Sequence, residues 1–569
     1  MATDTLVSDR HPDVDTLAAA STLAVVGAAL TGCGGGGGDD GPASTTPPPP
    51  VGPAAPPTDA EAARFLAQAS MGASRAEIAS VKALGYPGWL DAQFALPATQ
   101  SRWDALVALG AADATYRNGE FGFDSVAWKK LLSGPDTLRQ RIVLALSEIF
   151  VVSVSSLGGG GWKAFCGAQF LDLLESHAFG RHRELLQAVS LSSAMGVYLT
   201  YRGSAKANPS TGALPDENYA RELMQLFTIG LVELNADGTV KLANGAATPT
   251  YGQDDIGGLA RVFTGWEFDY AGQTAAVATA TPELHRRPMV NIASRHEPGA
   301  KTFLGTTIPA GTAASTALAT ALDTVHRHAN TGPFLARQLI QRLVTSNPSP
   351  AYVARTAAVF ADDGSGVRGN LKAVVRALLL DAEARSVPAA AGAGKLREPI
   401  LRFASWARAL SVASASGAWN VGNTSDAGTR LAQSPLRSPS VFNFFRPGYL
   451  PPNTPIGAGG LVAPEFQITN ESSVVGVVNF LQRAVGGSVG DLAPDAATMA
   501  ALVALADDPP ALLAELNVVL AAGRLLAATL ETVRVAIASM ATGSDATRTR
   551  RVQAALVLVL AAPESIVQA

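Results

Sequence analysis

An unusual density of hydrogen-bonding side chains marks the segment 217–230, which reads ENYARELMQLFTIG. Its amphipathic pattern predicts a helix on which Asn218, Arg221 and Glu222 share one face. A glutamate can exchange a proton with a substrate, and a guanidinium can hold an anionic group. We therefore take Glu222 and Arg221 as candidate catalytic residues and Asn218 as a candidate substrate-binding residue. The alternative is a solvated face on which Glu217 supports Arg221 as an i,i+4 pair.

A second group of ionisable side chains lies on a predicted turn with the sequence HEPGAK. Histidine is the side chain that titrates near neutral pH, so His296 is the candidate partner of Glu222 in proton exchange. Lys301 would hold an anionic group and is the fourth candidate catalytic residue, while Glu297 is a candidate substrate-binding residue. The alternative is a surface hydrogen-bonded pair of His296 and Glu297 that takes no part in chemistry.

Three further side chains complete the candidate substrate-binding set. Asp255 belongs to an aspartate pair near a helix N-terminus, where a carboxylate either contacts a substrate or interacts with the helix dipole. Trp266 follows a helix end and either stacks on a sugar or another flat group or packs in the core. His328 precedes a helix start and either contacts a substrate or orients that turn. His326 and His328 are two residues apart and cannot share a helix face, so we expect no metal site.

The composition excludes several classes of protein. Only 16% of the 569 residues are charged, the formal net charge is −4, and there are two cysteines. A nucleic-acid-binding protein would carry a basic patch, and a Cys-rich zinc module would need more cysteines. The sequence also has no P-loop and no H-E-x-x-H helix, and from the sequence the cofactor is unknown. We therefore expect no nucleic-acid partner.

The N-terminal sequence predicts where the protein is located. Residues 17–31 form an apolar run of about the length of a signal-peptide core, too short to span a membrane. The run leads into LTGC, which resembles a bacterial lipobox and makes Cys33 the predicted lipidation site. The Gly- and Pro-rich segment 34–58 predicts a disordered tether. The alternative is an alanine-rich disordered leader with a chance cysteine, because residues 1–16 carry four aspartates against one arginine.

The remaining residues, 59–569, are predicted to form a single helical body behind the signal peptide 1–33 and the tether. The fold class is mainly α, with a few short strands such as 301–308. Long irregular loops at 270–312 and 411–473 interrupt the helices, and loops of this length are often functional. Stretches with helical periodicity recur at 137–153, 168–177, 184–194, 217–231, 254–263, 334–345, 352–362, 371–381, 396–410, 473–484 and 510–541.

Several of these segments, taken in order, resemble a bacterial family known as the domain of unknown function DUF1800. The most characteristic stretch is PDENYARELMQLFTIG, followed by a Tyr-x-x-x-Asp segment from Tyr251 to Asp255 and by ARVFTGW. The sequences HEPGAKTFLG, LLESHAFG, SAMGVYL and SPLRSPSVFNFFRPGY also fit. Glu297 stands where the family usually has Asp. The resemblance covers about residues 60 to 569.

The resemblance implies export to the bacterial envelope, with genes often beside those of a second exported family similar to sulfatases and alkaline phosphatases. It supplies no established reaction. Our leading hypothesis is an envelope lipoprotein, held to the membrane by its lipid, that works as an accessory or binding component with such an exported hydrolase-like partner. The alternative is an extracytoplasmic hydrolase or lyase acting on envelope or extracellular polymer through Glu222 and His296. In a third interpretation, the same polar residues only fasten long loops to the helical body.

Overall fold

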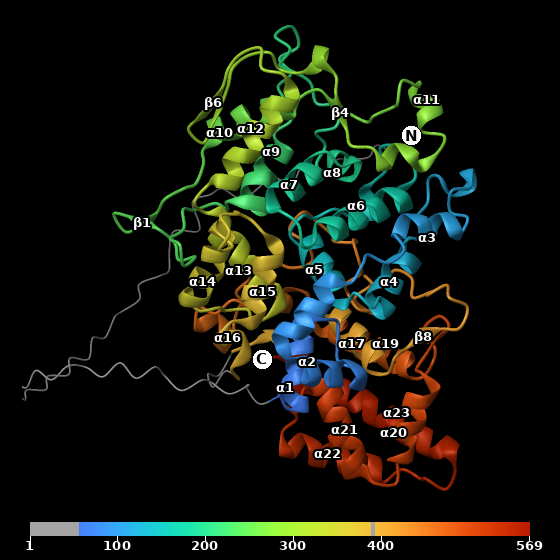
Figure 1. The fold of residues 1–569 in the computed structure, drawn as a ribbon. Helices are drawn as coiled ribbons and strands as arrows, with labels where there is room; N and C mark the ends of the chain where they lie inside the picture. Colours follow the sequence, from blue (N-terminus) through green and yellow to red (C-terminus); the bar gives the residue numbers. More distant parts are fainter. Residues whose placement is uncertain (1–55, 388–392) are drawn as a thin grey trace, which may run out of the picture. The chain divides into compact units, whose positions relative to one another are not determined.

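The computed structural model describes residues 56–387 and 393–569. The predicted signal peptide, the lipidation site Cys33 and nearly all of the tether lie outside the described residues. Within the described part, twenty-four α-helices and ten short strands confirm the predicted mainly α class (Figure 1). None of the described helices combines the length and the apolar character needed to cross a membrane.

The helices fall into three consecutive groups along the chain. The first group is α1 (Asp59–Ala69), α2 (Arg75–Ala95), α3 (Arg102–Ala108), α4 (Phe123–Ser133), α5 (Thr137–Ser147), α6 (Lys163–His177), α7 (His182–Ser190) and α8 (Ser193–Tyr198). The second is α9 (Asn218–Glu222), α10 (Gln253–Ala260), α11 (Ala275–Ala278), α12 (Ala314–Arg327), α13 (Thr331–Leu343), α14 (Pro350–Ala361), α15 (Leu371–Leu380), α16 (Ala382–Arg385) and α17 (Pro399–Ala409). The third is α18 (Pro455–Ala458), α19 (Glu471–Val485), α20 (Ala496–Ala504), α21 (Pro509–Ala521), α22 (Ala527–Ala538), α23 (Asp545–Ala561) and α24 (Pro563–Ile566).

The strands are two or three residues long and form five antiparallel pairs. The pairs are β1 (Leu242–Ala243) with β2 (Ala246–Ala247), β3 (Trp266–Glu267) with β4 (Val290–Asn291), β5 (Lys301–Phe303) with β6 (Thr306–Ile308), β7 (Lys395–Leu396) with β10 (Val567–Gln568), and β8 (Ala413–Ser414) with β9 (Leu492–Ala493). The predicted strand at 301–308 is thus a hairpin. Short helical turns include the π-helix η4 (Leu223–Thr228) and the 3-10 turns η5 (Arg261–Phe263), η6 (Pro282–Arg286) and η8 (Pro464–Ile468).

Helix starts follow from short polar signals in the sequence. Thr58 and Glu61 form a capping box at the start of α1, and Ser74 and Glu77 form another at the start of α2. In each box the hydroxyl oxygen accepts a backbone N–H of the first turn, and the glutamate accepts the N–H of the capping residue. Both groups would otherwise lack a partner at a helix end, so these side chains fix where the helix begins.

Two predicted helices are interrupted in the structure. The stretch 510–541 is divided into α21 and α22, because Ala522 adopts a left-handed conformation with φ of 53° and Gly523 follows with φ of 75°. The stretch 217–231 begins as α9 and continues as the π-helix η4. A π-helix changes the hydrogen bonds from i→i+4 to i→i+5 over a single turn, which the amphipathic period of the sequence does not reveal.

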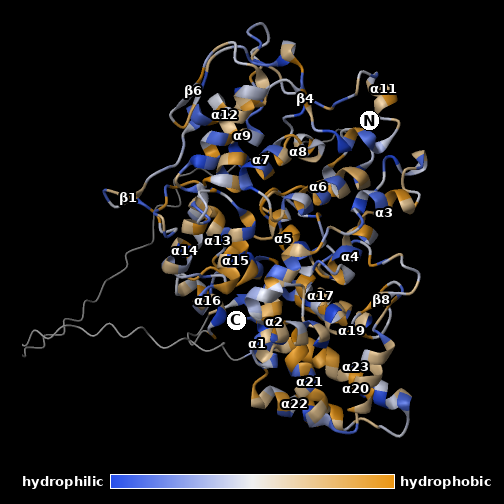
Figure 2. Ribbon diagram, viewed as in Figure 1, coloured by the Kyte–Doolittle hydropathy of each residue, from blue (hydrophilic) through white to orange (hydrophobic). Residues whose placement is uncertain are grey.

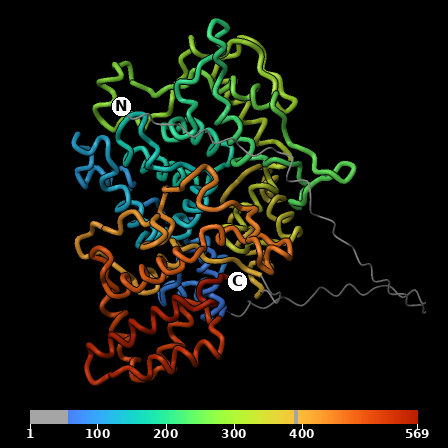
Figure 3. Tube along the Cα trace, turned by 180° about the vertical axis from the view of Figure 1, so that it is seen from behind, coloured from blue at the N-terminus to red at the C-terminus, as the bar shows by residue number. Residues whose placement is uncertain are grey.

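One hydrophobic core runs through all three groups of helices. Helix α5 packs against α2, α6 and α13, while α17 packs against α4 and α21. Apolar residues are concentrated on α21 and α23 (Figure 2). The first helix, α1, packs against α21, and the two lie side by side in both views of the chain (Figures 1 and 3). Early and late segments of the sequence therefore share the same core.

Arginines from distant parts of the chain hydrogen-bond the last carbonyl groups of several helices. Arg408 donates to the carbonyls of Leu131 and Gly134 at the end of α4, at 2.9 and 2.8 Å. Arg368 donates to the carbonyl of His326 at the end of α12, at 3.1 Å. The last four carbonyls of a helix lack intrahelical partners, and the helix dipole favours a cation there. Similar bonds join Arg342 to Glu148 after α5, Arg402 to Leu560 in α23, and Arg551 to Ala506 after α20.

Arg64 of α1 makes the most extensive of these contacts. Its guanidinium donates to the carbonyls of Ala384 and Arg385 at the end of α16, at 2.8 and 2.6 Å. It also donates to the Ala569 carbonyl at 2.6 Å, next to strand β10. One buried side chain thus joins three segments that are separated by hundreds of residues.

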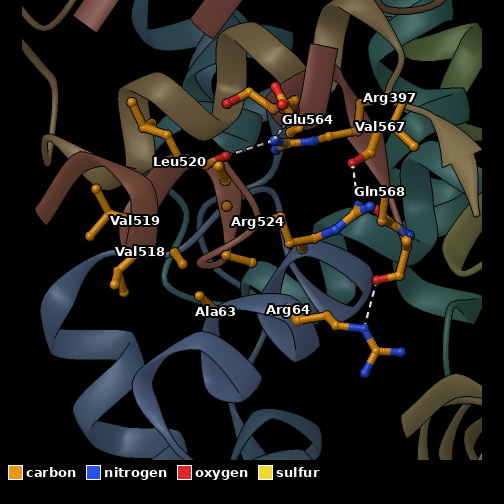
Figure 4. Close-up of a pocket in the computed structure, with 17 residues that line it drawn as sticks. Ala63, Arg64, Arg397, Val518, Val519, Leu520, Arg524, Glu564, Val567 and Gln568 are labelled. Atoms are coloured by element: carbon orange, nitrogen blue, oxygen red, sulfur yellow. Dashed lines mark hydrogen bonds between the residues drawn. The ribbon is translucent and has the colours of Figure 1, made fainter. Parts of the chain in front are cut away.

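Two further arginines fasten the same region (Figure 4). Arg397 donates to the carbonyl of Leu520 at the end of α21, and Arg524 donates to the carbonyl of Val567 in β10. The cavity enclosed by these groups has a volume of only about 30 Å³. That is room for about one water molecule, so this cluster closes the core and does not form a ligand site.

Replacing Arg64 by Met should destabilise the protein by at least about 3 kcal/mol, because several buried carbonyls would lose their donor at once. Urea denaturation followed by circular dichroism measures the change. Arg550→Met, at an exposed arginine of α23, is the matched control and should cost less than about 0.5 kcal/mol. Equal effects of the two substitutions would show that the Arg64 contacts do not stabilise the fold.

Candidate functional site

Glu222 has the most unusual surroundings of the predicted catalytic residues. It is the last residue of α9, at the point where the α-helix passes into the π-helix η4. Its side chain is 7% exposed, and its Oε2 atom has no hydrogen-bond partner among the described residues. Burial raises the pKa of Glu222 from 4.5 to about 7. Such a carboxyl group suits proton exchange, and π-helical turns are frequent at functional sites.

Two tyrosines lie close to Glu222. Burial, and in addition the charge of Glu222, raises the pKa of Tyr198 and raises that of Tyr251 to about 12. The Tyr251 hydroxyl has no hydrogen-bond partner within the described part of the chain. Both phenol groups therefore stay protonated at neutral pH.

The other two predicted residues of α9 have ordinary surface contacts. The guanidinium of Arg221 lies 3.2 Å from the carboxylate of Glu217, which is the i,i+4 pair given above as the alternative. Glu217 also accepts hydrogen bonds from Gln253 of α10 at 2.8 and 2.9 Å. Asn218 is exposed, and its amide donates to the Thr200 hydroxyl at 3.4 Å. These contacts attach α9 to its neighbours.

The side chains of the HEPGAK turn form hydrogen bonds with nearby backbone groups. The Nδ1 atom of His296 lies 3.0 Å from the Thr264 carbonyl, so Nδ1 carries the proton in neutral imidazole. Glu297 accepts the N–H of Gly299 at 3.0 Å, and the buried Lys301 ammonium donates to the Gly299 carbonyl at 3.2 Å. Burial lowers the pKa of both His296 and Lys301. The Nε2 atom of His296 has no partner among the residues the structure describes, so it alone is free to accept a proton.

The carboxylate of Asp255 is occupied by backbone amides. One of its oxygens accepts the N–H of Gly252 at 2.8 Å, and the other accepts the N–H of Leu304 at 2.7 Å in the β5–β6 turn. Trp266 is 5% exposed, and its indole N–H donates to the Val262 carbonyl at 3.1 Å. Neither residue presents a free polar group or an open ring face to a ligand in this structure.

His328 contacts the turn before a helix start, which is the alternative given above for this residue. Its Nδ1 atom accepts the backbone N–H of Asn330 at 3.1 Å, just before α13. Asn330 in turn donates to the carbonyls of Ile229 and Val232, both at 2.8 Å, and accepts the N–H of Leu234 at 2.9 Å. His328 and Asn330 together hold the loop that follows η4 against the helical body.

The predicted site residues thus separate into groups with different hydrogen-bond partners. Glu222 lies with Tyr198 and Tyr251, whereas His296 lies with Thr264 and its own turn. No hydrogen bond or ion pair between described residues joins Glu222 to His296. The two are therefore not a preformed acid–base pair, although each has an atom without a partner that could exchange a proton.

A cavity of about 680 Å³ lies between α3, α6, α7, α8 and the turn η6. Helix α6 contacts each of the other four elements. Hydrogen-bonding groups of both kinds surround the cavity, and apolar groups form part of its wall. The polar lining residues are Ser101, Gln169, Asp172, Ser176, His177, Glu184, Gln187, Ser192, Ser193, His285, Arg286 and Arg287.

Three buried side chains that the sequence reasoning missed line this cavity together. The Ser193 hydroxyl lies 3.0 Å from Nδ1 of His285, and the Cys166 thiol lies 3.6 Å from the same hydroxyl. His285 Nε2 lies 3.0 Å from the Gly161 carbonyl. Ser193 belongs to the SAMGVYL block of the resemblance, and His285 lies in the long loop 270–312. Their convergence could not be found from spacing, because they come from segments about ninety residues apart.

A cluster of charges is buried where α5, α13, β7 and η8 approach one another. The Lys395 ammonium lies 3.0 Å from Glu465 and 3.6 Å from Glu398, and Arg342 lies 3.5 Å from Glu148. All five side chains are at most 8% exposed. Burial, with the Glu398 charge in addition, raises the pKa of Glu148 well above its ordinary value. Because each charge has an opposite charge within 4 Å, this cluster is a structural network of the core.

Two short patterns of common enzyme classes occur without the structure that they require. The sequence GGSVG at 486–490 has the form G-x-S-x-G, but it follows the helix α19 instead of a strand. Ser488 is therefore exposed on a loop and not on a strand-to-helix elbow. The sequence GSGVRG at 364–369 lies between α14 and α15 and does not follow a strand either.

Comparison with known proteins confirms the resemblance seen in the sequence. The family model described as "Protein of unknown function (DUF1800)" matches residues 64–567. No curated protein and no solved structure matches the chain. The match covers nearly the whole helical body.

Replacing Glu222 by Gln should change stability in a pH-dependent manner. Between pH 4.5 and pH 7 the folded protein binds more protons at Glu222 than the unfolded chain does, so stability is lost as the pH rises through this window. Above pH 7 the variant should be more stable than the wild type by about 1–3 kcal/mol, and below pH 4.5 the two should be equal. Thermal melting across this range measures the difference. Glu283→Gln, at an exposed glutamate, controls for the lost charge, and a difference that does not vary with pH would contradict the raised pKa.

Proposed function

The chain belongs to the DUF1800 family, whose description assigns no activity, and we propose that it is a cell-envelope lipoprotein that binds a polymer segment and works beside an exported hydrolase-like partner. The observation that carries the binding role is the cavity of about 680 Å³ on α6. Cavities of 300 to about 1,000 Å³ are typical of small-ligand sites. This volume would hold a few sugar residues.

The side chains around the cavity favour a ligand rich in hydroxyl groups. Gln169 and Gln187 can both donate and accept hydrogen bonds. His177 is a third group that can do both, and Glu184 adds an acceptor. A sugar hydroxyl likewise donates and accepts, so it would find partners of both kinds. Positive Arg286 and negative Glu184 lie on the same lining, which favours a segment of low net charge.

The location rests on the N-terminal sequence. An apolar run leading to the lipobox-like LTGC supports lipidation at Cys33, and the segment 34–58 supports a tether between lipid and body. A body held at a membrane by such a tether can present a bound polymer to a second exported protein. The partner that the family resemblance suggests is similar to sulfatases and phosphatases.

Hydrolysis or elimination on an envelope polymer remains a second candidate function. The observation that favours it is the buried Glu222 carboxyl, whose pKa is raised to about 7 at the start of a π-helix. His296 would then contribute from its own turn only after a movement that brings it to the substrate.

Filling the cavity should abolish polymer binding. Ala188 lies on α7 in the wall of the cavity, and Ala188→Trp would occupy much of the space that the ligand needs. We expect the purified wild-type chain to co-sediment with peptidoglycan sacculi and the variant to bind at least tenfold more weakly. Ala536→Trp, at an exposed position of α22, controls for the added indole and should bind like the wild type. Equal binding by both variants would exclude this cavity as the polymer site.

Replacing Cys33 by Ala should release the protein from the membrane. The thioether-linked lipid would be lost, and a tether alone has no affinity for a bilayer. Fractionation of cells that express each form, with metabolic labelling by a fatty-acid analogue, measures both the location and the lipid. Cys166→Ala is the matched control, because Cys166 is buried in the body. A wild-type protein that is soluble and unlabelled would overturn the lipoprotein assignment.

A further inference from the structure

We propose that Ser193 and His285 form a nucleophile–base pair that removes an ester-linked acyl group from a ligand held in the cavity on α6. The place of the ligand rests on the proposed function, whereas the chemistry rests on the pair itself. Both side chains line the cavity and are 3% exposed. They are therefore largely shielded from bulk solvent.

The hydrogen bonds of His285 fix which of its nitrogens carries the proton. Nε2 lies 3.0 Å from the carbonyl oxygen of Gly161, and a carbonyl can only accept, so Nε2 is the protonated atom. In neutral imidazole Nδ1 is then a lone-pair acceptor. The Ser193 hydroxyl, 3.0 Å away, must donate its proton to Nδ1. A histidine activates a serine through such a hydrogen bond, but here the two ring nitrogens are exchanged relative to the usual triad and a backbone carbonyl replaces the carboxylate.

Two neighbouring features hold the pair in this state. Burial lowers the pKa of His285 to about 4, so the imidazole is neutral at pH 7 and its Nδ1 lone pair is unprotonated. Burial raises the pKa of the Cys166 thiol to about 12, so this thiol remains protonated 3.6 Å from the Ser193 oxygen. Cys166 is therefore a weak donor to the serine oxygen and not a competing nucleophile.

The glycine run at 158–161 explains how the backbone can approach His285 so closely. A Cβ atom at Gly160 would lie 2.8 Å from the Phe268 ring and 3.2 Å from Cε1 of His285. Gly161, whose carbonyl accepts from the imidazole, has a φ of 73°. The run thus positions the carbonyl that selects the tautomer of His285.

Arg286 is the positive group available to an ester carbonyl in the cavity. It follows His285 directly, lines the cavity, and its guanidinium lies 5.1 Å from the Trp103 ring centre. It is exposed, so it can turn toward a bound ligand. A guanidinium near the carbonyl would stabilise the negative charge that develops on its oxygen.

The reaction proceeds in two balanced steps. Oγ of Ser193 attacks the ester carbon while its proton passes to Nδ1 of His285, and the tetrahedral intermediate then breaks its bond to the alcohol, which leaves with that proton. Water attacks the acyl-serine in the same manner, giving up a proton to Nδ1, and Ser193 is regenerated as the carboxylic acid leaves. Neither step needs an oxidant or a reductant.

Covalent labelling of the purified full chain tests the pair directly. A fluorophosphonate probe forms a P–O bond with an activated serine and loses fluoride. We expect peptide mass spectrometry to place the label on Ser193 of the wild-type chain. Ser193→Ala should reduce labelling to background, and His285→Gln should slow it by about 10²–10⁴-fold. Hydrolysis of 4-nitrophenyl acetate should fall in parallel in both variants.

Ser488→Ala is the matched control, since Ser488 is the exposed serine of the G-x-S-x-G sequence, and it should label and hydrolyse like the wild type. No label on the wild type, a label on another residue, or equal labelling of Ser193→Ala would each overturn the proposal. The sacculus assay separates this result from the proposed function. A wild-type chain that labels on Ser193 but binds no sacculi would refute the binding role alone, whereas a wild-type chain that binds sacculi without a label on Ser193 would refute the nucleophile–base pair alone.

Discussion

Helix ends set the main requirement that this fold has to meet. A body of twenty-four described helices has many C-termini, each with carbonyl groups that lack an intrahelical partner, and many of these ends are buried. Arg408 meets the requirement at the end of α4, Arg368 at the end of α12, and Arg64 at the end of α16. Each of these arginines comes from a different segment of the chain. The same contact thus gives the carbonyl groups of a helix end a donor and joins two distant segments of the chain.

The same need for hydrogen-bond donors at buried helix ends explains why many of the few charged side chains lie inside the body. Many arginines lie inside the body, and the network of Arg342, Lys395, Glu148, Glu398 and Glu465 is buried as well. In the structure Asp255 and His328 bind backbone N–H groups that fix loops. Glu222 differs from them because its Oε2 atom has no partner within the described residues.

Much of the fold could be predicted from local patterns. Capping boxes, such as those at Thr58 and Ser74, and amphipathic periods both identify helices. They do so because the apolar face and the capped N-terminus that stabilise a helix are encoded within the helix segment itself. The π-helix after Glu222 could not be predicted, because it depends on how the neighbouring helices pack around it. The break between α21 and α22 at Ala522 could not be predicted either, because an alanine gives no local signal for a left-handed conformation.

The site was harder to predict than the fold, because a cavity is a property of several segments at once. Glu222 was chosen on residue type, and its burial and raised pKa keep it a candidate. The pairing with His296 required the two segments to meet, and no described contact joins them. Ser193 and His285 are ordinary residues in their own segments, and only the packing of α6, α8 and η6 brings them to one cavity.

Strand β10 pairs with β7, and Arg64 reaches the carbonyl of Ala569 across 505 positions of the sequence. During synthesis, α1, α16 and β7 leave the ribosome long before residues 567–569 exist to complete their contacts. The growing polypeptide therefore cannot complete these contacts for most of its translation, because the residues that α1 and β7 bind are synthesised last. The order of synthesis thus leaves the first helix, α1, without its C-terminal contacts until translation ends.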